Sequence, residues 1–486
     1  MPRSRTPRAE LVCTALLFAF LLWLPLPFGS TPDEFQLPLV AGALGICGVT
    51  ALILARSKNQ LALSAAHRSW TAGAVVFMLV VALQLIVLPA PLLRFVSPQS
   101  ARIWNDATNV ASMILGPLPA AHPISIDPST TTLQFFRLLA YFATFTAAAL
   151  LVRRHPQRVL FAVVLGCSAL FQAVYGIREA AIHRFSIWGW KNSLIFDRVT
   201  GTFVNPNHFA HYAALIAPFG MFILAMAWHD ASPARTRLWY RIVRIFERRF
   251  LPGAFGALII GACLVAILVS KSRGALLALF AGAAVGLAAA TGRRLLRVAL
   301  FLAAGAVAVL AIVLYLGSEH TSLARFVPTE GEARTAGGRR TGVETAVAIW
   351  KRFPLFGSGL GTFIDLAPML QPDEFDRVYN HAHDDYAEIA ATTGIVGLAA
   401  FLVPLALGLT QFVRANLGRD ATSWRRRAFH AASLASITTA LVHALVDFNF
   451  FIPANAATLA AIAGVAVATR SEPSALRGSA LEDSQA

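Results

Sequence analysis

Hydrophobic residues recur along this chain in long, nearly uninterrupted stretches that short polar segments separate. A helix needs roughly 20 residues to cross the hydrocarbon core of a bilayer, and twelve stretches approach that length. They are 11–28, 35–55, 70–88, 133–152, 159–177, 209–228, 251–269, 275–291, 298–316, 395–412, 428–446 and 453–469. The pattern predicts an all-α polytopic membrane protein with about twelve transmembrane helices.

The composition and the charge distribution agree with this prediction. Of the 486 residues, 57% are hydrophobic and 14% charged, whereas about a quarter of the residues in a soluble domain are charged. The net charge of +16 would suit nucleic-acid binding only if Lys and Arg were clustered on one accessible surface. Instead, alternate connections that include both termini carry a net charge of +18, and the others carry −2. This asymmetry predicts cytoplasmic termini, and nucleic acid is not needed to explain the charge.

The predicted topology suggests three parts: N-terminal helices 1–5 with their loops (1–199), a core (200–464) and a cytoplasmic tail (470–486). Three long loops lie on the predicted outer side, at 89–132, 178–208 and 317–386. Connections beyond about 12–15 residues are usually functional or disordered, so the longest loop is the first place to seek a site. The four cysteines, Cys13, Cys47, Cys167 and Cys263, are isolated in apolar stretches and are expected to be packing residues.

Two polar clusters occur at the predicted outer ends of helices. The segment GTFVNPNHFAH holds Asn205, Asn207 and His208 directly before an apolar helix. Asn207 could simply cap that helix, although capping does not require the adjacent histidine. The hairpin SKSRG places Lys271 and Arg273 outside, against the positive-inside pattern. Contact with lipid phosphates is one explanation, and recognition of a diphosphate by the planar guanidinium is the other.

The longest loop contains a third cluster. Arg339 and Arg340 precede a Gly-rich stretch, PLFGSGLGTF, which lacks the lysine and the strand of a phosphate-binding loop. NHAHDDY then follows, with His381, His383 and Asp385 just before the next helix. Two histidines two residues apart do not share a helix face, which disfavours a metal site. A general base needs only one imidazole that a carboxylate orients.

A fourth cluster, VHALVDFNFFIPAN, places His443 and Asp447 four residues apart on one helix face. A structural hydrogen-bonded pair and a functional role are both open. Together, the outer arginines and histidines fit group transfer from a lipid diphosphate. Fixed cations can stabilise the leaving group without metal, and a histidine can deprotonate an acceptor hydroxyl.

Five of these segments resemble the bacterial O-antigen ligase and polymerase superfamily, the membrane glycosyltransferases with a Wzy-C type core. They occur in family order, and each lies on the predicted outer side. They are TGTFVNPNHFA (200–210), SRG (272–274), the run from Arg339 to PLFGSGLGTF (354–363), HDDYAEIAATTGIVGL (383–398) and HALVDFNFFIPAN (443–455). At position 384 this chain has Asp where the family usually has Asn.

The resemblance implies a helical fold of the lipid-carrier (GT-C-like) glycosyltransferase type in the bacterial inner membrane. It also implies metal-independent transfer of a glycan from undecaprenyl diphosphate at the periplasmic face, with no cofactor. Arg273 and Arg339 would stabilise the diphosphate and His383 would activate the acceptor. The remaining polar positions are expected to bind substrate: Lys271, Arg340, Asn205, Asn207, His208, Asp385, His443 and Asp447.

The acceptor stays open, because family members differ in it. Ligases use lipid A-core, polymerases use a second lipid-linked glycan, and some relatives glycosylate proteins. The expected partners are therefore the undecaprenyl-diphosphate-linked glycan, a glycan or lipid A-core acceptor, and membrane lipids. The alternative from another class is a polysaccharide flippase or other secondary transporter. Such proteins commonly contain internal repeats and interrupted helices at the midplane, and this sequence shows no repeat.

Overall fold

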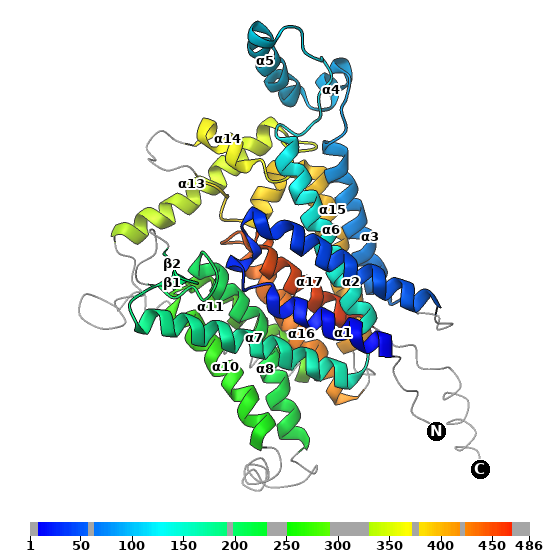
Figure 1. The fold of residues 1–486 in the computed structure, drawn as a ribbon, viewed down its shortest axis with the longest axis vertical. Helices are drawn as coiled ribbons and strands as arrows, with labels where there is room; N and C mark the ends of the chain where they lie inside the picture. Colours follow the sequence, from blue (N-terminus) through cyan, green and yellow to red (C-terminus); the bar gives the residue numbers. More distant parts are fainter. Residues whose placement is uncertain are drawn as a thin grey trace.

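A computed structural model describes residues 8–56, 63–191, 198–230, 250–291, 330–371, 379–417 and 423–468, and these form a helical bundle (Figure 1). The α-helices are α1 (Arg8–Trp23), α2 (Gln36–Arg56), α3 (Ala65–Gln84), α4 (Ala90–Val96), α5 (Pro98–Leu115), α6 (Pro128–Leu151), α7 (His155–Ala181), α8 (Pro206–Asp230), α10 (Phe250–Val269), α11 (Arg273–Thr291), α13 (Glu330–Arg352), α14 (Phe363–Leu370), α15 (Asp385–Leu417), α16 (Trp424–His443) and α17 (Pro453–Val467). Three 3₁₀ turns, η1 (Phe28–Ser30), η2 (Asp33–Phe35) and η4 (Asn449–Phe451), and the hairpin β1 (Ser186–Ile187) and β2 (Trp190–Lys191) complete it.

Eight of the described helices are long and apolar enough to cross a membrane, which makes this a multi-pass membrane protein. They are α2 (together with η2), α3, α6, α7, α8, α10, α11 and α15. The predicted stretches at the N-terminus and at 428–446 and 453–469 form α1, α16 and α17. Of these, α1 has 16 residues and α17 has 15. The stretch 298–316 lies outside the described residues, so a total of twelve spans stays a prediction.

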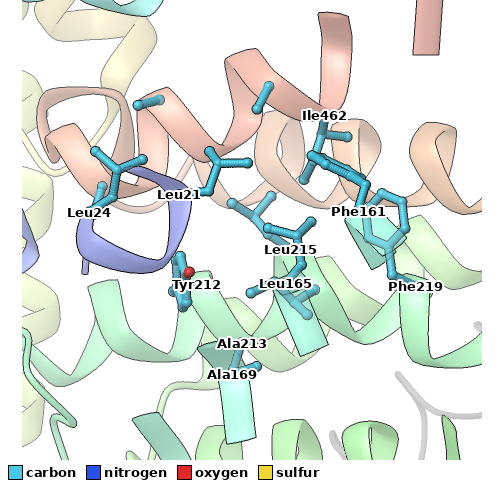
Figure 2. Packing of buried hydrophobic residues seen from close by; sticks show 14 of the residues in the cluster. Leu21, Leu24, Phe161, Leu165, Ala169, Tyr212, Ala213, Leu215, Phe219 and Ile462 are labelled. Carbon is cyan, nitrogen blue, oxygen red and sulfur yellow. The ribbon is translucent and has the colours of Figure 1, made fainter. Parts of the chain in front are cut away.

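The core of the bundle surrounds α8, the most buried of the eight candidate spans. Figure 2 shows side chains of α1, α7, α8 and α17 meeting there, with Tyr212 and Phe219 of α8 among them. The ring of Phe219 packs edge-on against Phe161 of α7, with 5.7 Å between the ring centroids. Because lipid offers no hydrophobic force to hold helices together, close packing has to do so.

Small residues permit that close packing between the helices that position the site. A Cβ on Gly256 of α10 would lie 2.9 Å from the carbonyl oxygen of Gly220 in α8. A Cβ on Gly282 of α11 would clash with Thr439 and the carbonyl of Ala435, both in α16. The α8–α10 and α11–α16 pairs therefore approach through glycine, as is common for helices in membranes.

The long outer loops contain helices of their own. In Figure 1, α4 and α5 project beyond α3 and α6, and α13 and α14 lie near the same end of the bundle. We call this end of the bundle the loop end. The helices that begin at the loop end are α6, α8, α11, α15 and α17, and α16 ends there. The region 330–371 belongs to the predicted loop 317–386, of which 317–329 and 372–378 lie outside the described residues.

The Gly-rich stretch has a structural role at a break in α15. Gly394 interrupts the helix with φ +67°, a conformation that side chains disfavour. Residues 354–359 fill the gap: the amides of Ile395 and Val396 donate to the carbonyls of 354 and 355 at 2.9 and 3.2 Å, and the amide of Gly359 donates to Thr392 at 3.0 Å. PLFGSGLGTF is thereby fixed against α15, and its three glycines have positive φ at positions where a Cβ would collide with Thr392, Ser125 or Gln134.

Candidate functional site

Five histidines and one aspartate gather at the loop end from three separate parts of the chain. We call them the histidine cluster: His208 and His211 of α8, His381 and His383 before α15, His443 of α16, and Asp447. Asp447 lies at the centre and is only 1% exposed. Its Oδ1 is 3.7 Å from Nε2 of His208 and 3.5 Å from Nδ1 of His383.

The two imidazoles beside Asp447 differ in access. The side chain of His383 is 25% exposed, whereas that of His208 is 5% exposed. Since Nδ1 of His383 faces the carboxylate, its Nε2 lies on the opposite edge of the ring and is the better placed nitrogen for a ligand. His383 therefore combines a carboxylate partner with an accessible nitrogen, which a general base requires.

The charge of Asp447 depends on these contacts. Burial on its own would raise the pKa of the Asp447 carboxyl, but the contacts with His208 and His383 outweigh it and hold the pKa well below its usual value. Asp447 is thus an anion at neutral pH. An anion in this position stabilises the imidazolium that forms when His383 accepts a proton.

A second imidazole pair lies deeper. Nδ1 of His211 and Nδ1 of His443 are 2.8 Å apart, and both residues are buried. One of these nitrogens must donate and the other accept, so a single proton lies between the rings. On its other edge, His443 abuts the SKSRG hairpin: a Cβ on Gly274 would lie 3.0 Å from Nε2 of His443. His443 thus fills the space between α8 and the start of α11.

Phe448 joins the exposed and buried parts of the cluster. The centroid of its ring is 4.6 Å from that of His208, 4.1 Å from His381 and 5.0 Å from His383. It stacks on the ring of His381, with 16° between the planes, and makes T-shaped contacts with His208 and His383, at 81° and 73°. No feature of the sequence alone assigned a role to this residue.

The structure distinguishes the two neighbouring arginines of α13. Arg339 is partly buried, and its Nε has no hydrogen-bond partner among the described residues. It lies close enough to His443 to act on it electrostatically. The side chain of Arg340 is 82% exposed and forms an ion pair with Glu344, with 2.8 Å between Nε and Oε1. Arg339 is therefore the more enclosed of the two arginines, and Arg340 is largely exposed.

The SKSRG hairpin is tied to the first motif by Arg198, which the sequence analysis missed. Nε of Arg198 donates to the carbonyl of Ser270 at 2.8 Å, and Nη2 donates to Oδ1 of Asn207 at 3.0 Å. Lys271 follows with φ +55°, and Arg273 begins α11. A basic residue two positions before TGTFVNPN, on the predicted outer side, was the available signal.

Replacing Arg198 with alanine is expected to disturb the hairpin that carries Lys271 and Arg273. The carbonyl of Ser270 loses a charged donor, and hydrogen bonds to charged groups contribute about 1.5–3 kcal/mol. If this hairpin binds the lipid diphosphate that the sequence resemblance implies, we expect the KM for that lipid to rise by roughly tenfold, the equivalent of about 1.4 kcal/mol, with Arg198→Lys intermediate. Steady-state kinetics on purified protein would measure this, and an unchanged KM in Arg198→Ala would contradict it.

Two of the predicted substrate-binding residues, Asn205 and Asp385, and the neighbouring Asp384 make contacts that stabilise the local structure. Asn205 caps α8, because its Oδ1 accepts the amide of Asn207 at 2.8 Å; the prediction that Asn207 is the cap is wrong by two residues, since α8 begins at Pro206. Asp384 caps α15 by accepting the amides of Tyr386 and Ala387 at 2.9 and 3.0 Å. Asp385 is fully buried and accepts the amide of Phe450 at 3.2 Å.

The histidine cluster does not form a candidate metal site. Within the described ranges, no group of three or more His, Cys, Asp or Glu side chains has an arrangement that could hold a metal ion.

An apolar cavity of about 290 Å³ lies beside the cluster. It is lined by α3, α6, α15, α16 and α17 and by Phe450 and Phe451. Phe451 also contacts the ring of His381, with 5.3 Å between centroids. Along α15 the lining includes Ile389, before the break at Gly394, and residues from Ala400 to Leu405 after it. The cavity thus extends from the polar site along the membrane-spanning part of the bundle.

These features define a class: a multi-pass membrane protein whose polar site, rich in imidazoles and arginines, lies at one end of a helical bundle. A family model described as O-Antigen ligase matches residues 255–402. The match confirms the resemblance that the motifs indicated and identifies a segment of the O-antigen ligase and polymerase superfamily in this chain. It includes Arg273, Arg339 and His383. A search of curated proteins finds no match.

The family match implies an enzyme of the glycosyltransferase type that acts in polysaccharide assembly on glycan or lipid-linked substrates. It does not distinguish ligases from polymerases.

Proposed function

We propose that this protein transfers a glycan from undecaprenyl diphosphate to an acceptor hydroxyl at the periplasmic face of the bacterial inner membrane, in O-antigen or exopolysaccharide polymerisation or ligation. Both termini would be cytoplasmic, as the positive-inside asymmetry predicts. One observation carries the proposal most strongly: an accessible imidazole, His383, is paired with an ionised, buried Asp447 at the end of a membrane bundle that also presents arginines.

In this proposal His383 is the general base. Its imidazole takes the proton from the acceptor hydroxyl as the oxygen attacks the anomeric carbon of the donor glycan. The bond between that carbon and the diphosphate oxygen breaks, and undecaprenyl diphosphate leaves with the bonding electrons. Asp447 stabilises the resulting imidazolium. A general base has to lie within reach of the proton and to have a suitable pKa. The negative charge of Asp447 stabilises the positive charge that the His383 ring acquires when it is protonated.

Arg273 and Arg339 would stabilise the negative charge that develops on the leaving diphosphate. Fixed donors aimed at developing charge are usually a large part of catalysis. Arg339 is supported over Arg340 by its partial burial and its proximity to His443. Lys271 lies two residues from Arg273 in the same hairpin and adds positive charge there. His208 and His443 would act through their contacts with Asp447 and with the hairpin.

The apolar cavity supports a lipid-linked donor. Its volume of about 290 Å³ is just below the roughly 300–1,000 Å³ of ligand pockets, so it would hold part of one chain. Its direction, from the cluster into the membrane-spanning region, would place a polar head group at His383 and Arg339 while the chain lies among Phe77, Phe142 and Phe401.

Reconstitution tests this function and identifies the acceptor. Purified protein in liposomes is supplied with a lipid-diphosphate-linked glycan and either a second such lipid or lipid A-core, and the products are separated by mass. Lengthened glycan on the carrier indicates a polymerase, and glycan on lipid A-core indicates a ligase. We expect transfer to persist with a chelator. Transport of the intact donor across the bilayer without any new glycosidic bond would reject the proposal.

A further inference from the structure

A buried glutamate, Glu388, lies in the first turn of α15 and is not used in the mechanism above. It is 0% exposed, and both of its carboxylate oxygens accept hydrogen bonds. Nδ1 of His381 lies 2.8 Å from Oε1, and the amide of Ala382 donates to Oε2 at 2.8 Å. Glu388 thus reaches back six and seven residues and fixes the segment directly before His383.

That segment needs to be fixed, because His383 has an unfavourable backbone conformation. Its φ is +56°, in the left-handed region that residues other than glycine rarely adopt. Such a conformation persists only where the surrounding structure enforces it, and it is found often at active sites. Two contacts hold Ala382, the residue directly before His383. The amide of Ala382 donates to Glu388, and its carbonyl oxygen packs so closely on Gly342 of α13 that a Cβ there would lie 2.7 Å away.

The bond to His381 fixes the side-chain surroundings as well. With Nδ1 of His381 held by Glu388, the imidazole stacks on Phe448 at 4.1 Å between centroids and 16° between planes. The same phenyl ring meets His383 at 5.0 Å and 73°. The carboxylate of Glu388 therefore fixes the backbone before His383 through its bond with Ala382. Through His381 it also fixes the position of Phe448, which packs against the His383 ring.

We propose that Glu388 is a positioning residue for glycan transfer: it holds His383 in the conformation in which Nδ1 faces Asp447 and the opposite edge faces the acceptor. The role rests on the proposed function of His383. Glu388 is 0% exposed, so in this arrangement it acts through His381 and Ala382 and does not reach the substrate itself.

Kinetics of Glu388→Ala and Glu388→Gln test the role. A misplacement of about 1 Å at a reacting group can cost about 10²-fold in rate. We expect kcat to fall about 10²-fold in Glu388→Ala and KM for the donor lipid to change little, because the arginines stay in place. Glutamine retains one carbonyl acceptor, so Glu388→Gln should lose less. The control is Glu344→Ala, an acid of α13 that is 53% exposed and paired with Arg340. A folded Glu388→Ala protein with wild-type kcat would overturn the proposal.

A second measurement does not depend on transfer activity. Diethyl pyrocarbonate modifies accessible imidazoles, and the rate at His383 can be followed by peptide mass spectrometry. We expect this rate to change several-fold in Glu388→Ala and to stay unchanged in Glu344→Ala. An unchanged rate would overturn the positioning role whether or not the protein transfers glycan. An altered rate in a protein whose wild type transfers nothing would instead count against the proposed function alone.

Discussion

Replacing His383 with glutamine is expected to lower the rate of glycan transfer by about 10²- to 10⁴-fold, the range that a positioned general base contributes. Glutamine retains polar atoms of similar reach but cannot take up a proton at neutral pH. Because the arginines and the apolar cavity are untouched, binding of the donor lipid should be retained. Single-turnover assays with a lipid-diphosphate-linked glycan in liposomes separate this loss of rate from a loss of binding.

His122→Gln is the matched control. This histidine also lies in a long connection, but it stacks on Trp104 at 4.6 Å and contacts Thr108 at 3.1 Å, and it makes none of the contacts of the histidine cluster. We expect its activity to be close to wild type. If His383→Gln transferred glycan at the wild-type rate, the general base would have to be another group.

The second large effect is expected at one of two adjacent arginines. Removing a donor that stabilises developing negative charge typically costs about 10²- to 10³-fold in kcat, and we expect a loss of this size for Arg339→Ala. Arg340→Ala should stay within about twofold, because an exposed ion pair such as that with Glu344 contributes about 0.2–1 kcal/mol at most.

The two variants share their helix and their change in charge, so only the direction of the side chain differs. Initial rates at saturating and limiting donor would show which step is affected. Equal losses in both variants would indicate a general effect of positive charge and would contradict a specific contact by Arg339.

Hydrophobic patterning predicts most of the bundle, because each span has to present apolar side chains to lipid. It does not predict α13 and α14 in the stretch treated as a loop. The α13 sequence is rich in Gly, Arg and Glu, and only a few apolar residues, such as Ala346 and Ile349, form its buried side. The predicted span 395–412 begins directly after the break at Gly394, and the part of α15 before the break, from Asp385, was not predicted as helix. The bonds that compensate for the break come from residues about 40 positions earlier in the sequence.

The candidate site shows a similar division. The residue types at the outer ends of helices suggested a histidine base and outer arginines, and the resemblance to the family motifs singled out His383, Arg273 and Arg339. They could not indicate Arg198 or Glu388. The role of Arg198 depends on a carbonyl 72 residues away, and that of Glu388 depends on a left-handed turn at His383. Such roles follow from tertiary contacts rather than from spacing in the sequence.

The contacts of Phe448 affect how measurements on individual histidines have to be interpreted. One phenyl ring touches His208, His381 and His383, so a substitution at any of them leaves space into which the ring can move. Free-energy effects of residues that share a partner are generally not additive. A rate lost on changing one imidazole therefore includes a share from the other two. Phe448, which has no polar side-chain atom, thus couples the effects on the transfer rate of substitutions at His208, His381 and His383.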